Sequence, residues 1–206
     1  EHSAEKWGAS CYTLAGVTPR PQCAMAPRPE QRNKPMISPT LRGTVVAACR
    51  KAERGLPKYP VDAIELIANR GTAGDYHAGE LIRHRFLARK APDRPNHRQV
   101  LLADTSIYAE VAERGITLGP GMLGENITLD GIAIMSIPVG TCIEIGETLL
   151  ELTEERNPCL QLRQLHPDLL KTVATKANGK VRRNAGIMAR VLRDGWVEPG
   201  HTAVVL

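Results

Sequence analysis

Cys159 carries the strongest indication of chemistry in this sequence. It follows Pro158, where an expected strand leads into an expected helix, and Arg156 and Arg163 lie close by in the sequence. Cationic neighbours and a helix N-terminus both favour the thiolate form of a cysteine. A thiolate can act as a nucleophile or as a ligand of a soft metal. The alternative is a small apolar side chain buried in a core.

A loop bracketed by glycines holds two more polar candidates. Residues 74–79 read Gly-Asp-Tyr-His-Ala-Gly, so that Asp75 and His77 lie two positions apart. We expect the pair either to line a pocket or to form an Asx-turn with an exposed histidine. His77 could also serve Cys159 as a base in a thiol hydrolase, but no cysteine-protease signature surrounds that cysteine.

Three glycines match the dinucleotide-binding pattern G-x-G-x-x-G: Gly119, Gly121 and Gly124. A nucleotide site of this kind needs a strand before the glycines and a helix after them, so that the helix N-terminus meets the pyrophosphate. Here the preceding segment is expected to be helical and the following segment to be a strand. We therefore reject a nucleotide site and expect these glycines to supply positive φ angles in a tight loop.

Composition argues against several other classes of protein. The 206 residues include five cysteines, an odd number without a Cys-x-x-Cys pair, which disfavours zinc, iron–sulfur and disulfide frameworks. This cysteine usage predicts a reducing, cytoplasmic location. Aromatic residues make up 3%, which argues against RNA binding on aromatic platforms. No apolar stretch approaches the roughly 20 residues that span a bilayer, so we expect no membrane association.

The net charge of +5 is distributed unevenly along the chain. Residues 160–206 hold eight Lys or Arg against three acidic residues, and residues 83–98 hold six Lys or Arg against Asp93. Such clustering marks an anion-binding site or simply a solvated surface. Binding of nucleic acid through these stretches is the least favoured function.

Short strands dominate the elements that must position these residues. Alternating or β-branched runs predict strands over residues 42–49, 61–68 and 98–103. Asp104 is expected to cap a helix over residues 105–114, and a second helix is expected over residues 160–176.

Two dipeptides predict hairpins in the middle of the chain. Asp130-Gly131 is expected to join residues 126–129 to residues 132–134, and Gly146-Glu147 to join residues 141–145 to residues 148–153. With further short strands after residue 185, the pattern indicates a mainly β (α+β) fold, a barrel-like domain with a few peripheral helices. We place this domain at residues 41–206. Residues 1–40 hold six of the fifteen prolines and are expected to form a poorly ordered leader.

Three sequence islands, taken in order, resemble the MOSC family, which is named after the C-terminal domain of molybdenum cofactor sulfurases. They are Gly74–Gly79, then Pro-Gly-Met-Leu-Gly-Glu-Asn at residues 120–126, and Arg-Asn-Pro-Cys at residues 156–159. The resemblance covers roughly residue 43 to the C-terminus, about one domain. It implies a β-barrel related to the small barrel domain of pyruvate kinase, and binding of a pterin molybdenum cofactor (molybdopterin).

The resemblance also implies roles for particular residues. Cys159 is the expected protein ligand of molybdenum, a soft centre that suits a thiolate. Asp75, His77 and Asn126 match pocket positions that would contact the pterin or orient the substrate. Tyr76 departs from the family pattern, in which arginine is frequent at that position.

Other implied contacts concern the cofactor itself. Gly121 and Glu125 belong to the same island as Asn126 and are further cofactor-binding candidates. The cofactor's phosphate needs cations or free backbone N–H groups, for which the candidates are Arg156, Arg182 and Arg183.

Two functions of different class follow from the resemblance. The first is an oxotransferase that reduces small N-hydroxylated substrates with electrons from a separate flavoprotein or haem protein, because the chain has no iron–sulfur or nucleotide fingerprint. The second is a non-catalytic carrier of the molybdenum cofactor, or of persulfide sulfur on Cys159. Kinship of fold does not decide between them.

Overall fold

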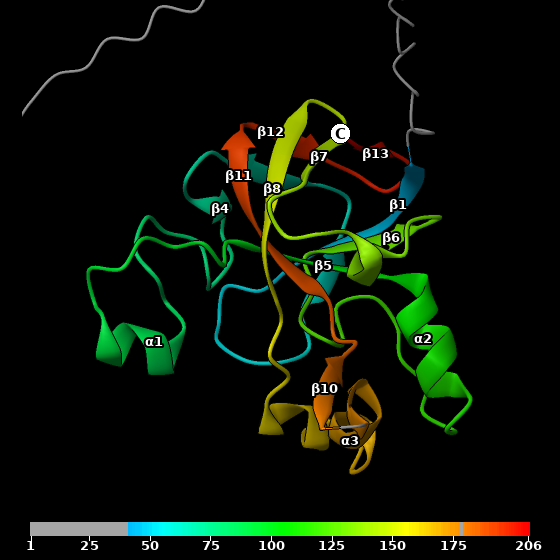
Figure 1. The fold of residues 1–206 in the computed structure, drawn as a ribbon. Coiled ribbons are helices and arrows are strands. Elements are labelled where there is room, and N and C mark those ends of the chain that lie inside the picture. Colours follow the sequence, from blue (N-terminus) through cyan, green and yellow to red (C-terminus); the bar gives the residue numbers. More distant parts are fainter. Residues whose placement is uncertain (1–40, 178) are drawn as a thin grey trace, which may run out of the picture. The chain divides into compact units, whose positions relative to one another are not determined.

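The computed structural model describes residues 41–177 and 179–206 (Figure 1). The leader expected over residues 1–40 lies outside the described residues. One eight-stranded sheet dominates the fold. Its strands, in spatial order, are β13 (Thr202–Val205), β7 (Cys142–Ile145), β8 (Thr148–Glu155), β11 (Ile187–Arg193), β5 (Val100–Asp104), β6 (Ile127–Asp130), β1 (Arg42–Arg50) and β2 (Tyr59–Val61).

The sheet closes on itself because β13 also pairs with β1, where Arg42 lies opposite Val204. Seven strands thereby form a barrel, and β2 extends from its side. All pairings in this sheet are antiparallel except that of β5 with β6. The prediction of a mainly β, barrel-like domain is confirmed.

Alternation of side chains fills the barrel with aliphatic residues. In β8, for example, Thr148, Leu150 and Leu152 are buried, whereas the residues between them are partly exposed. Successive side chains of a strand point to opposite faces, so a period of two directs one set inward. Leu150 and Leu152 there join Ile127 and Leu129 of β6 in the main core cluster.

Smaller elements surround the barrel. β3 (Ile64–Ile67) lies between β4 (Gly71–Thr72) and β12 (Gly195–Val197) in a three-stranded sheet, and β9 (Ala174–Ala177) pairs with β10 (Lys180–Arg183). The helices are α1 (Arg85–Lys90), α2 (Thr105–Ala112), α3 (Leu169–Val173) and the 3₁₀ helices η1 (Ile134–Ser136) and η2 (Leu160–Gln164). Within the described residues, every helix falls short of the length and apolarity needed to cross a bilayer.

Asp104 caps α2 as predicted. Its carboxylate accepts a hydrogen bond from the backbone N–H of Ser106 (2.9 Å) and another from that of Ile134 (2.9 Å). The Asp104 side chain thus pairs with a free backbone N–H at the start of α2 and also holds η1 against β5. Ile107 and Val111 of α2 pack with residues of η2 and α3 in a second core cluster.

The continuous helix predicted over residues 160–176 is wrong. The structure instead has η2, then α3, and then strand β9. Pro167 lies between the two helices, where it lacks an N–H donor and disfavours helical geometry at His166. Beyond Val173 the chain leaves the helix and pairs with β10, Arg183 lying opposite Ala174.

Of the two predicted hairpins, one is confirmed. β7 and β8 pair across Gly146-Glu147, with Ile145 opposite Thr148. The hairpin at Asp130-Gly131 is wrong, because residues 133–136 turn into η1 after β6. Ile132 and Ile134 are buried in the core instead of pairing with β6. The strand expected over residues 61–68 is likewise divided between β2 and β3.

Candidate functional site

Asp75 anchors a buried network at one end of the barrel. In the loop after β4, its Oδ1 accepts a hydrogen bond from the backbone N–H of His77 (2.9 Å), which makes the expected Asx-turn. Its Oδ2 lies 2.7 Å from Lys58 Nζ and accepts from Asn126 Nδ2 (3.1 Å). Burial raises the pKa of Asp75, but the hydrogen bonds from His77 and the charge of Lys58 outweigh it and hold the pKa below its usual range. Asp75 is therefore a carboxylate at neutral pH.

His77 lies between this carboxylate and the open pocket. Its Nδ1 is 3.4 Å from Asp75 Oδ1, and 37% of its side chain is exposed. The ring of Tyr76 packs edge-on against it, with 5.1 Å between centroids. A carboxylate at one ring nitrogen orients the imidazole so that the other nitrogen, Nε2, is available to donate or accept a proton. Of the two alternatives for this loop, the Asx-turn forms, and His77 but not Asp75 lines the pocket.

Lys58 and Asn126 form the floor. Lys58 Nζ donates to Asn126 Oδ1 (2.9 Å), and Asn126 Nδ2 also donates to the backbone carbonyl of Cys49 (3.1 Å). Burial lowers the pKa of Lys58, while the neighbouring carboxylate of Asp75 raises it. The floor is thus a closed set of hydrogen bonds that ties β1 and the residue before β6 to the Asp75 loop.

Glu125 and Gly121 lie behind this floor and do not line the pocket. Glu125 is fully buried; its Oε1 accepts from the backbone N–H of Gly121 (2.8 Å) and from the hydroxyl of Tyr108. Burial, and then the charge of Glu125, raise the pKa of Tyr108 above its ordinary value. At Gly121, where φ is +79°, a Cβ atom would overlap the carbonyl oxygen of Lys58. Glu125 and Gly121 therefore support the floor residues without facing the pocket.

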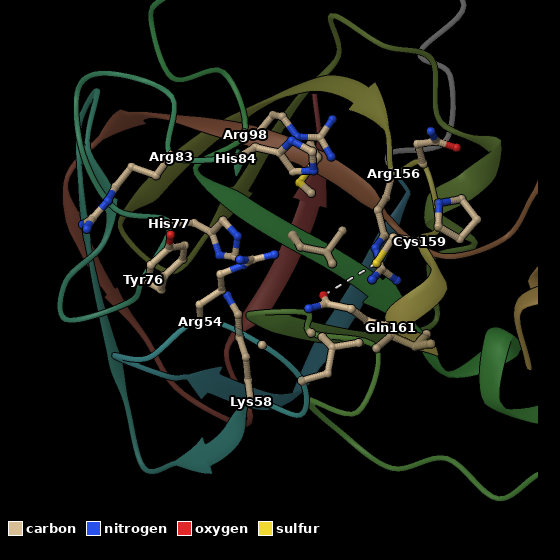
Figure 2. A pocket seen from close by; sticks show the side chains of 18 of the residues that line it. Arg54, Lys58, Tyr76, His77, Arg83, His84, Arg98, Arg156, Cys159 and Gln161 are labelled. Atoms are coloured by element: carbon tan, nitrogen blue, oxygen red, sulfur yellow. Dashed lines mark hydrogen bonds between the residues drawn. The ribbon is translucent and has the colours of Figure 1, made fainter. Parts of the chain in front are cut away.

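Arg156 and Cys159 come together where β8 ends. Arg156 is 6% exposed, and its Nη1 is buried without a hydrogen-bond partner among the described residues. Cys159 caps η2 through its backbone and has an exposed thiol, whose Sγ lies 3.6 Å from Gln161 Oε1. Burial lowers the pKa of Arg156, whereas negative charge on Cys159 raises it. Figure 2 shows the sulfur of Cys159 beside the guanidinium of Arg156.

These residues surround a pocket of about 730 Å³, within the usual range for small-molecule sites. Of the predicted site residues, His77, Asn126, Arg156 and Cys159 line it, and Asp75 lies directly below. Among the described residues, six lysine or arginine side chains line the pocket and no aspartate or glutamate does so: Arg54, Lys58, Arg83, Arg89, Arg98 and Arg156. In the described part of the chain, no group of three or more His, Cys, Asp or Glu side chains is arranged to hold a metal ion.

Several pocket residues were missed by reasoning from the sequence, chiefly Arg54, Lys58 and His84. A signal existed for part of the set, because the basic stretch at residues 83–98 supplies Arg83, Arg89 and Arg98. No local pattern marks Arg54 or Lys58, which reach the pocket only through the fold.

Two of the predicted phosphate ligands lie outside the pocket lining. Arg182 of β10 pairs with Glu110 of α2 (3.0 Å). Arg183 hydrogen-bonds Asn157 Oδ1 (3.4 Å) and lies 4.0 Å from Glu155. Neither arginine lines the pocket, although Arg183 contacts Asn157, which does.

Comparison with known proteins adds a family to this geometry. The family profile described as MOSC domain matches residues 74–204. The YuaD protein from Bacillus subtilis has a similar structure, with a TM-score of 0.67 and 20% identity over 81% of this chain and 96% of that chain.

Two YiiM structures are also similar. That from Geobacillus stearothermophilus has a TM-score of 0.53 and 22% identity over 80% of this chain and 73% of that chain. That from Escherichia coli has a TM-score of 0.54 and 20% identity over 80% of this chain and 69% of that chain. At these identities the likeness shows a shared fold alone. No curated protein matches the chain.

Proposed function

Because the chain belongs to the MOSC domain family, we propose that its pocket binds a pterin molybdenum cofactor, with Cys159 as the protein ligand of the metal, and that it reduces N-hydroxylated compounds. One observation carries the proposal. The exposed thiol of Cys159 lies in a pocket lined, within the part of the chain that the structure describes, by six lysine or arginine side chains and no carboxylate. Such a lining suits a large anionic ligand with a soft metal at one end.

The residues present fit this cofactor. Arg156 Nη1 is buried and lacks a hydrogen-bond partner among the described residues, so a phosphate or another anionic group would satisfy it. Cys159 supplies the soft ligand beside it, and Asn126 offers a polar group at the floor. When bound, a molybdenum cofactor would provide a centre that can accept an oxygen atom and exchange two electrons.

His77 serves as the proton donor in the proposed reaction. Reduction of an N-hydroxyl group breaks the N–O bond, takes up a pair of electrons and a pair of protons, and releases water. Asp75 holds His77 through its backbone N–H (2.9 Å) and faces Nδ1 (3.4 Å), so that Nε2 is left to deliver a proton. Lys58 keeps Asp75 ionised and fixed, which makes it a positioning residue rather than a proton donor.

The electrons come from a separate flavoprotein or haem protein, as the sequence predicts. We also retain the cytoplasm as the expected location. The odd number of cysteines without a Cys-x-x-Cys pair supports a reducing compartment.

Metal and pterin content test the proposal directly. The full chain is produced in a bacterial host that makes the cofactor, and molybdenum is measured by elemental mass spectrometry and pterin by fluorescence after oxidation. We expect wild type and the control Cys142→Ser to carry both, and Cys159→Ser to lose molybdenum. Equal molybdenum in Cys159→Ser would contradict the assignment of the ligand.

Turnover then separates the enzyme from the carrier. With a chemical reductant in place of the electron-donor protein, loaded wild type is expected to reduce benzamidoxime to benzamidine and water. A loaded protein that leaves benzamidoxime unchanged would favour the non-catalytic carrier, which uses the same cysteine but has no need of His77.

A further inference from the structure

A group of nitrogen-bearing side chains lies across the pocket from Cys159. We call Arg54, His84 and Arg98 the distal cationic cluster; all three line the pocket. In Figure 2, Arg54 lies on the far side from Cys159, and Arg98 lies beside His84. The three come from separate segments: the loop after β1, the residue before α1 and the segment before β5. The fold therefore gathers them from distant parts of the chain.

The pKa of His84 reflects the positive charges that surround it. Burial lowers its pKa, and the positive charges of Arg98, His77 and Arg54 lower it further against the opposing charge of Glu154. Its Nδ1 is also buried without a hydrogen-bond partner in the described part of the chain. Mutual repulsion and an unpartnered nitrogen are both relieved when an anion enters the cluster.

Carboxylates neutralise only part of this charge. Lys58 pairs with Asp75, and Arg98 pairs with Glu154 at 2.9 Å. Within residues 41–177 and 179–206, four arginines of the pocket lining have no carboxylate within 4.0 Å: Arg54, Arg83, Arg89 and Arg156. Arg156 lies beside Cys159, whereas Arg54 lies across the pocket, so unpaired charge is found at both ends.

Resting on the proposed function, we propose that the distal cationic cluster binds the anionic group of the substrate, while Arg156 serves the cofactor at the Cys159 wall. The preferred substrates are then N-hydroxylated compounds that also carry a carboxylate or a phosphate, which bind more tightly than neutral ones such as benzamidoxime. Leu56, Leu123 and Met188 line the same pocket and provide contact for an apolar or aromatic body between the two ends.

Equilibrium binding without reductant tests this substrate class on the cofactor-loaded full chain. The probes are two matched pairs: benzoate with benzamide for the carboxylate, and adenosine monophosphate with adenosine for the phosphate. Arg54 is exposed and is replaced without disturbing the core. The variants are Arg54→Gln, the charge-preserving Arg54→Lys, and Arg114→Gln as a control that removes one charge from an exposed position outside the pocket lining.

We expect wild type to bind the anionic member of at least one pair about tenfold more tightly than its neutral partner. Arg54→Gln should lose most of that preference, whereas Arg54→Lys and Arg114→Gln should keep it. The pair that shows the preference identifies the anionic group as carboxylate or phosphate.

Two results would overturn the inference. One is equal affinity for both members of each pair in wild type. The other is loss of pterin and molybdenum from Arg54→Gln, because the cluster would then hold the cofactor's phosphate. Absence of pterin from wild type itself is a different result, seen before any binding is measured, and it overturns the proposed function on which the inference rests.

Discussion

Asp75 links the buried floor of the pocket to His77. One of its carboxylate oxygens faces Lys58 and Asn126, and the other faces His77. Asp75→Asn leaves the buried ammonium of Lys58 without a counter-charge. We expect it to lower the free energy of unfolding by about 3–5 kcal/mol at neutral pH, measured by urea denaturation. The exposed Asp62→Asn is the matched control and should change stability by less than about 0.5 kcal/mol. Equal losses in the two variants would contradict the role of Asp75.

The same carboxylate predicts a dependence of stability on pH. The pKa of Asp75 in the folded protein lies below its ordinary value of 3.8. Its contribution is therefore fully present above that value and is lost as the pH falls through the folded pKa. The stability difference between wild type and Asp75→Asn should shrink as the pH falls below about pH 4. Urea denaturation at each pH measures it, and a difference that persisted undiminished into acid would argue against this ion pair.

His77→Gln tests the proton donor separately from the fold. Glutamine keeps a polar side chain of similar reach but has no titratable nitrogen. We expect turnover of benzamidoxime to fall by at least about 100-fold while molybdenum and pterin contents stay at the wild-type level. His97→Gln, at an exposed position outside the pocket lining, should retain full turnover. A His77→Gln enzyme with wild-type turnover would remove His77 from the mechanism.

The sequence identified some of these residues and not others for a physical reason. Asp75 and His77 share one loop, and Cys159 follows Arg156 closely, so short motifs make them candidates, although spacing alone left their roles open until the family resemblance was added. Lys58 reaches its partner Asn126 across 68 positions of the chain. Contacts of that range are created by barrel closure, and no local pattern encodes them.

Among the connecting elements, the turn at Gly121 brings two segments of backbone into close approach. The Lys58 N–H donates to the Gly121 carbonyl (2.9 Å), and φ at Gly121 is +79°. Gly121→Ala must adopt this angle and also displace the Lys58 carbonyl. We expect a loss of unfolding free energy of about 2–5 kcal/mol, by thermal or urea denaturation.

Gly115→Ala is the matched control for this turn. Its φ is +72°, yet a Cβ atom there would meet nothing within 4 Å. The free energy of unfolding of Gly115→Ala should fall by only about 1–2 kcal/mol, which is the cost of the positive φ angle alone. If the two variants lost the same free energy of unfolding, the close approach of Gly121 to Lys58 would add nothing to the cost of the Gly121→Ala substitution.

The elements themselves were predicted best where one local interaction decides them. Asp104 caps α2 through its own side chain, and the Gly146-Glu147 turn joins β7 to β8. Prediction failed where tertiary contacts decided the outcome. Ile134 donates its backbone N–H to the distant Asp104, which favours η1 over a second strand. Pro167 is a local signal for the break after η2, because proline lacks the N–H donor that a continuous helix needs.

At the scale of the whole molecule, barrel closure makes β1 a central strand with partners along its length. Its first residues pair with β13, and later ones with β6 and β2. Cys49 lies near the end of this strand and is fully buried, whereas Cys159 is exposed at the pocket. Two thiols of one chain thus report on two different events, access to the pocket and opening of the barrel.

Alkylation of these thiols distinguishes the two events. Burial, followed by the charge of Glu125, raises the pKa of Cys49 to about 12. At pH 8 only about one Cys49 in ten thousand would be a thiolate, the form that reacts, even if reagent reached it. We expect iodoacetamide to label Cys159 in the folded protein and to label Cys49 only at denaturant concentrations that unfold the barrel, as followed by peptide mass spectrometry. Labelling of Cys49 below that transition would mean that β1 opens locally, and the barrel would then not unfold as one cooperative unit.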